Sequence, residues 1–457
     1  MRHHKRTDNE ECVMCEQNAA KMADLGDPGP RIDKDIAALV PQLKEIRRHL
    51  HKNAELSFQE VETAAYILKR LENLKGVEDI STGLGRAPPG FKGAAPGQIE
   101  YVRQEEGTGI TAYIKGKAGP GPCILLRADI DALPILENAP EREYASQNCG
   151  VMHACGHDGH VAMLLVAAEV LTSRRAEFKG SIKLFFQPAE EFGGGAQYML
   201  EQLDDVEQVY GFHLSTVLRT GTIGVKDGPL MAAVDKFTIS VKGKGGHGAM
   251  PHLSKDAMLC AMQIGVALQT VVSREVDPLE AAVVSIGKLE NEEGSTTCGC
   301  GSTWNVLCGN IVMSGTTRSF DNAVQQQVRM SVERIAVNVA AAMMCSAHVK
   351  WDDVNTGHPA TVNHTAEAAR ARAAAVKVVG EEGLRTGKEI MTMGGEDFSY
   401  FLNKKPGCFI FVGATAKGAE PTPHHHPSFD IDEESLAIGA TLWLQLVDEV
   451  LGNKLVC

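Results

Sequence analysis

The sequence predicts an α/β protein with a three-layer catalytic domain, built on a mostly parallel sheet, and an inserted two-layer βαββαβ domain. Apolar strands alternate with helical patterns before residue 234 and again after residue 353, which is typical of a parallel sheet covered by helices. Between these positions the strands alternate apolar and polar residues, as in a sheet with one solvated face. A chain of 457 residues is also too long for one comfortable core.

Four segments follow from this plan. Residues 1–30 begin with basic residues, continue without an apolar stretch, and are predicted to be a disordered tail rather than a signal peptide. Residues 31–233 and 354–457 form the two parts of the catalytic domain. Residues 234–353 form the inserted lid and dimerisation domain, whose one-sided sheet has free edges that favour pairing with a second copy.

The elements of the first part are predicted from helical spacing and from short apolar runs. They are helices within 31–75, a Gly- and Pro-rich surface loop over 81–109, strands at 111–115 and 123–126, a helix at 161–171, and strands at 181–187 and 206–210. The inserted domain reads as a strand at 237–241, a helix at 254–273, strands at 282–288 and 306–314, a helix at 324–345 and a strand at 348–351. A helix at 366–379, a strand at 408–412 and a helix at 433–451 complete the chain.

Composition excludes some classes of partner. The formal charge of −13 repels phosphate backbones and anionic lipid, so neither nucleic acid nor a membrane surface is expected as a partner. The longest apolar runs, at Val161–Val170 and Ile335–Cys345, fall short of a membrane span. Twelve scattered cysteines, including Cys12 and Cys15 and the group Cys298, Cys300 and Cys308, suggest free thiols in a cytoplasmic, reducing compartment.

The stretch Val151–His160 is the strongest chemical signal. Its ten residues hold three histidines, a cysteine and an aspartate, which are donor types for transition metals, together with two glycines. A polar loop with a structural thiol is the alternative interpretation. Further donors elsewhere in the chain decide between the two.

Those donors occur where predicted strands end. Asp129 and Asp131 follow one buried strand, and Glu190 and Glu191 follow the next. His213 follows a third, and His424–His426 lie in a later junction between a strand and a helix. Because the carboxyl ends of parallel strands meet at one edge of a sheet, these side chains are expected to converge.

Five donors exceed the needs of one zinc ion and point to two divalent ions that share a ligand. The candidates are Cys155, His157, Glu191, His213 and one of His424–His426. Neighbouring loop residues point apart, so Glu191 is expected to coordinate while Glu190 holds the attacking water as general base. Asp129 or Asp131 is expected to lie behind a ligating histidine and fix its tautomer.

Four motifs carry a resemblance to a known family. They are Arg127–Pro134 (RADIDALP), Cys155–His160 (CGHDGH), Gln187–Glu191 (QPAEE) and Gly394–Phe398 (GGEDF). The chain resembles, from about Pro41 to Leu451, the dinuclear metal amidohydrolases that include hippurate hydrolase, N-acyl-amino-acid amidohydrolases and plant auxin-conjugate hydrolases. These enzymes are relatives of the aminoacylases and glutamate carboxypeptidases.

The resemblance implies roles for individual residues. Cys155 is similar to the ligand that bridges the two ions, and the last ligand of the family, two residues before a proline, selects His425. His157, Glu191 and His213 are similar to terminal ligands, Glu190 to the general base, and Asp131 is placed with the catalytic residues and Asp129 behind a ligand. The resemblance also implies that His247 polarises the scissile carbonyl, often across a dimer, and that Asn305 and Arg318 bind the substrate carboxylate.

The sequence therefore predicts a metal-dependent hydrolase that cleaves N-acyl-L-amino acids such as hippurate, with Zn, Mn, Co or Ni as suitable ions. A homodimer or higher homo-oligomer is expected. A dipeptidase or carboxypeptidase with the same ions is the enzymatic alternative, and a catalytically silent binding protein is the other. The insertion before Asn305–Cys308 and the long 81–109 loop depart from the family pattern and bear on the substrate.

Overall fold

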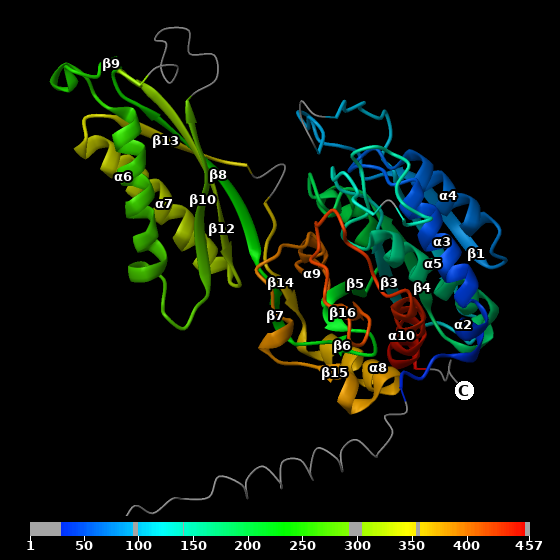
Figure 1. The fold of residues 1–457 in the computed structure, drawn as a ribbon. Coiled ribbons are helices and arrows are strands. Elements are labelled where there is room, and N and C mark those ends of the chain that lie inside the picture. Colours follow the sequence, from blue (N-terminus) through cyan, green and yellow to red (C-terminus); the bar gives the residue numbers. More distant parts are fainter. Residues whose placement is uncertain (1–28, 95–98, 140, 292–303, 353–356, 453–457) are drawn as a thin grey trace, which may run out of the picture.

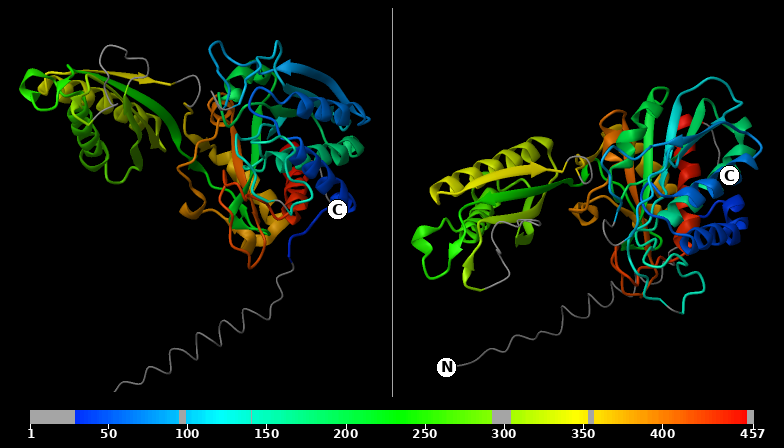
Figure 2. Two further views of the ribbon diagram at one scale, coloured as in Figure 1. Left: turned by 45° about the horizontal axis from the view of Figure 1, so that its top comes forward. Right: turned by 90° about the horizontal axis from the view of Figure 1, so that it is seen from above.

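A computed structural model describes residues 29–94, 99–139, 141–291, 304–352 and 357–452. It holds an eight-stranded sheet and a four-stranded sheet, which lie in two bodies (Figures 1 and 2). The bodies are joined near β7 (Gly228–Met231), β8 (Ala233–Lys242) and β14 (Thr361–Asn363). Almost all of the predicted tail, and the cysteines at 12, 15, 298 and 300, lie outside the described residues.

The large sheet has the order β1-β2-β4-β3-β5-β16-β6-β15. Its central strands β4, β3, β5 and β16 are parallel, while β1, β2 and the pairing of β16 with β6 are antiparallel. The strands are β1 (Val77–Leu84), β2 (Gly109–Lys115), β3 (Cys123–Asp129), β4 (Ser181–Gln187), β5 (Gln208–Arg219), β6 (Ile223–Gly224), β15 (Leu384–Arg385) and β16 (Gly407–Thr415). The predicted mostly parallel sheet is confirmed.

Helices cover both faces of this sheet. They are α2 (Lys34–Ala38), α3 (Val40–Lys52), α4 (Val61–Glu72), α5 (His157–Ser173), α8 (Thr365–Gly383), α9 (Ser399–Leu402) and α10 (Glu434–Leu451), with short 3-10 helices at Arg175–Glu177, Gly195–Leu203 and Lys388–Ile390. Along β3, Ile124 and Leu126 face the cluster under α5 and α10, whereas Leu125 faces the opposite cluster with α9. A two-residue period with both faces buried explains why the strand reads as a continuous apolar run.

The smaller sheet has the order β10-β12-β8-β13 and is antiparallel throughout. Its elements are β8 (Ala233–Lys242), α6 (Ala257–Thr270), a π-helical turn at Val271–Glu275, β10 (Ala282–Asn291), β12 (Asn310–Ser319), α7 (Asn322–Ala342) and β13 (Ser346–Trp351). A separate ribbon pairs β9 (Gly246–His247) with β11 (Val306–Leu307), and a 3-10 turn covers Pro251–Leu253. The βαββαβ order is confirmed.

Each sheet has its own core, because Phe237, Ile239 and Val241 of β8 pack with α6 and α7 and not with the large sheet. The short ribbon of β7 (Gly228–Met231) and β14 (Thr361–Asn363) lies at the connection between the two bodies (Figure 1). This arrangement supports the boundary at 233/234, which stays a proposal, and the boundary expected at 353/354 lies outside the described residues.

Three sequence expectations need correction. The loop at 81–109 begins only after Leu84, because β1 pairs with β2 up to that residue, and Phe91 within the loop is buried. The helix expected at 161 begins at His157, inside the donor motif. His213 lies within β5 and not beyond its end, because β5 continues to Arg219 beside β16.

The expectation about apolar runs also missed one helix. Among the described residues, Ala257–Glu275 is long and apolar enough to cross a membrane by length and composition alone, with 33% of its most apolar window buried. Cys260, Ile264 and Leu268 on its inner face pack against the small sheet. The helix is therefore a layer of the inserted body, and its outer face remains apolar.

Candidate metal centre

The donor motif forms a tight turn that leads directly into α5. Gly156 has φ 94°, a left-handed conformation that a side chain would strain, and it caps the N-terminus of the helix. The turn places Cys155 just before α5 and His157 in its first position, both buried. Glycine at this position lets the donors on either side of it, Cys155 and His157, face the same space.

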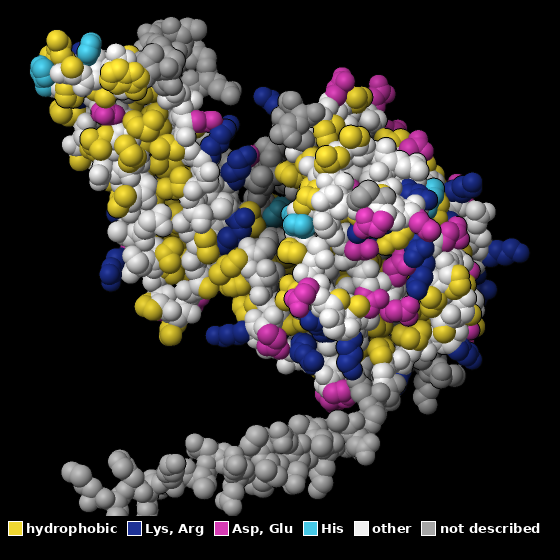
Figure 3. All heavy atoms as spheres, viewed as in Figure 1, with side chains coloured by type: hydrophobic (Ala, Val, Ile, Leu, Met, Phe, Trp, Pro, Cys, Tyr) yellow, Lys and Arg dark blue, Asp and Glu magenta, His cyan; other side chains and the backbone are white. Residues whose placement is uncertain are grey.

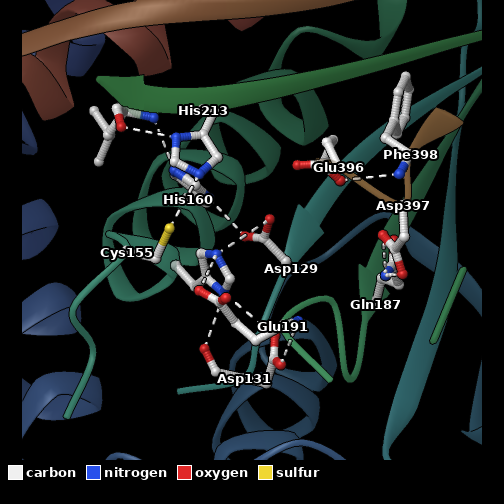
Figure 4. Close-up of polar contacts among 12 residues, drawn as sticks. Asp129, Asp131, Cys155, His160, Gln187, Glu191, His213, Glu396, Asp397 and Phe398 are labelled. Atoms are coloured by element: carbon white, nitrogen blue, oxygen red, sulfur yellow. Dashed lines mark hydrogen bonds and ion pairs between the residues drawn. The ribbon is translucent and has the colours of Figure 1, made fainter. Parts of the chain in front are cut away.

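The structure brings all five predicted ligands together. The ligand atoms of Cys155, His157 and His213 lie within 4.8 Å of one another, as do those of Cys155, Glu191 and His425. Cys155 Sγ is 3.4 Å from His213 Nε2, and His425 Nε2 is 3.3 Å from Glu191 Oε1. Figure 4 shows Cys155 and His213 pointing toward each other, with Glu191 nearby. Two groups of three donors thus share one sulfur.

Two buried atoms in these groups lack a hydrogen-bond partner within the described part of the chain. They are His157 Nε2 and Glu191 Oε1, which are 3.9 Å apart. A buried polar atom without a partner is costly unless something else satisfies it. Thiolate, imidazole and carboxylate are ligands that Zn, Mn, Co and Ni accept, so the residues fit a pair of divalent cations.

The electrostatics of the site agree with this fit. Burial, followed by Glu191 and Glu190, raises the pKa of the Cys155 thiol well above its usual value. Burial lowers the pKa of His157, but Asp129 and Asp131 outweigh it and raise this pKa to about 10. In both shifts the neighbouring carboxylates favour a bound proton, and a bound cation would take the place of such a proton.

Both aspartates of Arg127–Pro134 lie behind a histidine. Asp131 Oδ1 is 3.2 Å from His157 Nδ1, and its Oδ2 accepts hydrogen bonds from Ser57 Oγ and the Glu191 backbone N–H. The Asp131 carboxylate and carbonyl therefore direct His157 Nε2 into the centre.

Asp129 Oδ1 lies 2.5 Å from His160 Nδ1, while its Oδ2 lies 3.7 Å from His157 Nε2. The Leu214 N–H donates to the other nitrogen of His160. Sequence reasoning gave His160 no separate role. Its position three residues after His157, on the same face of α5, was the available signal.

Glu190 lies in a constrained turn at the end of β4. The preceding Ala189 has φ 55°, and its N–H donates to Glu60 Oε1 at 2.9 Å. The carboxylate oxygens of Glu190 and Glu191 both lie within 4.8 Å of His157, so the expectation that they point apart is wrong. Strain of this kind persists where surrounding contacts fix the backbone, and it is frequent at functional sites.

A buried acidic group stands behind Glu190. Glu396 and Asp397 place carboxylate oxygens within 4.8 Å of Glu190, and Arg127 pairs with both at 2.9 and 3.0 Å. Burial, then Glu396 and Glu191, raises the pKa of Glu190 well above its usual value. The motif Gly394–Phe398 thus supplies groups that set the charge environment of Glu190, a role that the sequence alone did not reveal.

The three consecutive histidines separate into different environments. His425 has φ 61°, donates its backbone N–H to Ala154 O, and places its ring on Glu191. His424 Nδ1 is 3.7 Å from Cys155 Sγ, but its Nε2 accepts from the Thr216 N–H. His426 is exposed and accepts from the Ser428 N–H. Only His425 of the three joins Glu191 and Cys155 in a donor group, as expected.

A cavity of about 850 Å³ lies between the two bodies and reaches this centre. Figure 3 shows the molecule hollowed at this place. The floor includes Cys155, Glu190, Glu191, His213 and His425, and the wall from the small sheet includes Arg318. Arg318 is held by hydrogen bonds to the carbonyls of Met393 and Thr317 and to the Thr316 hydroxyl.

His247 and Asn305 are not brought to this cavity. Both are exposed and lie on the β9–β11 ribbon, where the Gly248 N–H donates to Asn305 O. The ribbon stands at the far end of the inserted body (Figure 1). Within one chain, the described site therefore contains the predicted ligands, Glu190, both aspartates and Arg318, but neither of these two residues.

Comparison with known proteins identifies the class. Residues 125–449 match the model of peptidase family M20/M25/M40, and the chain belongs to this family of hydrolases that act on amide or peptide bonds.

Its relatives include an N-acetyl-L-cysteine deacetylase of Bacillus subtilis, 41% identical over 88% of this chain and 86% of that protein. The IAA-amino acid hydrolase ILR1-like 4 of Arabidopsis thaliana is 34% identical over 89% of this chain and 85% of the relative. Among solved structures, the YXEP protein of Bacillus subtilis, described as a dinuclear metal binding peptidase of family M20, is 36% identical. It superposes with a TM-score of 0.71 over 91% of this chain and 99% of its own.

Proposed function

We propose that this protein is a two-metal amidohydrolase that releases a carboxylate and a free amino acid from N-acyl-L-amino acids. The observation that carries the proposal is the pair of donor groups sharing Cys155 at the floor of a cavity whose wall holds Arg318. The names of the relatives agree, since one removes an acetyl group from N-acetyl-L-cysteine and another hydrolyses IAA-amino acids. Cys155, His157, Glu191, His213 and His425 are the proposed ligands.

Glu190 is the proposed general base. It accepts a proton from the attacking water and then donates this proton to the amide nitrogen, which leaves as the amine of the free amino acid. Divalent ions bound at the centre would polarise the scissile carbonyl and lower the pKa of the water. The Asp131 carboxylate holds the ring of His157 in place, and Arg318 binds the carboxylate of the amino-acid half.

The cavity bears on the acyl group. Its lining includes the apolar side chains of Leu218, Met231, Ile390 and Phe411 beside the donor atoms. Ligand cavities commonly measure 300–1,000 Å³, and about 850 Å³ exceeds what an acetyl group needs. An aromatic or long acyl chain is therefore the proposed preference, as in hippurate.

Elemental analysis of the purified protein, paired with a substrate panel, tests this function. The panel holds hippurate, N-acetyl amino acids and dipeptides. We expect about two metal ions per chain, and we expect hippurate to be hydrolysed faster than the dipeptides. Faster turnover of dipeptides would identify a peptidase, and a metal-loaded sample inert toward all three classes would support a silent binding protein.

We also propose that the inserted body pairs with a second copy. Leu259, Met262 and Val266 are 44%, 47% and 69% exposed, and their spacing places them on one face of α6. Figure 3 shows apolar side chains gathered over this helix, and β13 is an unpaired edge of the sheet. In a two-fold dimer the β9–β11 ribbon of one subunit would bring His247 and Asn305 to the cavity of the other.

A cytoplasmic location is proposed from the cysteines. Those at 123, 149, 155, 260, 308, 345 and 408, which lie in the described part of the chain, are all free thiols. Free thiols are typical of reducing compartments.

A further inference from the structure

Arg318 belongs to a row of three side chains that crosses the small sheet. Arg318 of β12 pairs in register with Val234 of β8, and Val234 forms an antiparallel bridge with His358. Residues directly opposite each other on neighbouring strands point to the same face. All three side chains line the cavity above the donor groups. The apolar side chain of Val234 therefore lies between a guanidinium and an imidazole.

The backbone and ring of His358 are held firmly in this row. Its N–H donates to Val234 O at 3.0 Å, and its own carbonyl accepts from the Val234 N–H at 2.9 Å. The ring lies edge-on to Tyr400 at 6.4 Å, and the Tyr400 hydroxyl donates to the Gly357 carbonyl. A Cβ on Gly395 would come within 3.1 Å of His358 Cδ2, so a side chain at that position would crowd the ring.

One nitrogen of this ring is left without a protein partner. Nδ1 of His358 is buried, and no atom of the described residues hydrogen-bonds to it. A buried hydrogen-bonding atom without a partner destabilises the folded state unless a bound molecule satisfies it. Burial, with a smaller effect of Arg318, lowers the pKa of His358 to about 4. The imidazole is therefore neutral near pH 7 and offers one donor and one acceptor beside a cation.

We propose that His358 is a specificity-determining residue that hydrogen-bonds, together with Arg318, the carboxylate on the amino-acid half of the substrate. Neighbouring strands lie about 4.8 Å apart, so the backbones of Arg318 and His358 stand roughly 10 Å apart across Val234. This spacing leaves room for a carboxylate whose two oxygens face the two side chains. The inference rests on the proposed function, because it takes the substrate to be an N-acyl amino acid.

Two matched substrates separate this role from a structural one. The first is the best N-acyl amino acid of the panel, and the second is the same molecule with its carboxylate replaced by a carboxamide. His358→Phe is expected to raise KM for the carboxylate substrate about 10- to 100-fold, the range of one hydrogen bond to a charged group. KM for the carboxamide and kcat for both are expected to change little.

Conservative variants refine the test. His358→Asn keeps a polar atom near Nδ1, and His358→Gln keeps one near Nε2, so one of them should recover part of the lost affinity for the carboxylate. His348→Phe, at an exposed position of β13, is the matched control and should leave KM unchanged. Calorimetric titration of the free amino-acid product should show the same order of affinities without turnover.

The outcomes are distinct. If His358→Phe raises KM equally for both substrates, or for neither, the assignment of His358 is overturned. The proposed function still holds in that case, provided that the wild type hydrolyses the acyl amino acid. If His358→Phe does not fold, the comparison of His358→Gln with wild type on the two substrates decides. If wild type hydrolyses no acyl amino acid, the proposed function fails, and with it this inference.

Discussion

The donor cluster at the large sheet and the β9–β11 ribbon of the inserted body both carry residues that the sequence assigns to the reaction. The cluster is complete within one chain, since Cys155, His157 and His213 meet within 4.8 Å. His247 and Asn305 on the ribbon are exposed and outside the cavity. The difference teaches that strands of one sheet fix the positions of their side chains within one chain, whereas the ribbon, at the far end of the inserted body, would reach a site only in the proposed dimer.

The largest expected effect lies in the cluster. Glu190→Gln should lower kcat by roughly 10²–10⁴-fold, because the amide cannot accept the proton of the attacking water. Bound metal should be retained, since Glu190 is in neither of the two groups that share Cys155. Steady-state kinetics with elemental analysis measure both, and near-normal turnover would refute Glu190 as the base.

The shared sulfur provides the second test. Cys155→Ser should weaken the binding of at least one metal ion. The loss of affinity should exceed the roughly 10–100-fold that is typical when a residue behind a ligand is lost. Metal content after dialysis measures the effect. Cys149→Ser is the control, because Cys149 is a free, exposed thiol. Unchanged metal content in Cys155→Ser would contradict a bridging role.

Mixed assemblies test whether the ribbon completes a neighbouring site. Glu190→Gln and His247→Ala should each be nearly inactive alone. After subunit exchange, about one site in four should combine an intact Glu190 with an intact His247 from the partner. Activity of the mixture is the measurement, and His252→Ala, an exposed change nearby, should be active without exchange. If the mixture stays inactive, His247 does not act across subunits.

The smallest effect is expected at the outer face of α6. Val266→Lys places like charges against each other across a two-fold interface and should weaken the dimer roughly tenfold or more. Sedimentation over a range of protein concentrations measures the shift. Val102→Lys, at a position 58% exposed on the other body, is the matched control. Equal behaviour of both variants would remove α6 from the interface.

Much of the fold and the centre could be predicted because the sequence signals are local. Apolar strands such as Cys123–Asp129 end in acidic pairs, and parallel pairing then requires those pairs to meet. The expectation that His213 follows its strand was wrong, because an apolar run does not show that β5 continues past the histidine.

Other features depend on contacts between distant segments. The left-handed Ala189 is held by Glu60, which lies at the start of α4, and no short sequence pattern predicts this contact. The place of His358 beside Arg318 depends on its backbone bridge to Val234, more than a hundred residues earlier in the chain. His247 would reach a metal centre only in the proposed dimer, which no local pattern in the sequence specifies.

Because one sulfur belongs to both donor groups, the centre has a single chemical weak point. Peroxide that reaches Cys155 and carries it to the sulfinic acid would remove a ligand from both groups at once, and thiol reductants would not reverse that change. An aspartate in the same position would be inert to peroxide. With cysteine at this position, the rate at which the enzyme loses activity would depend on the concentration of oxidant around it.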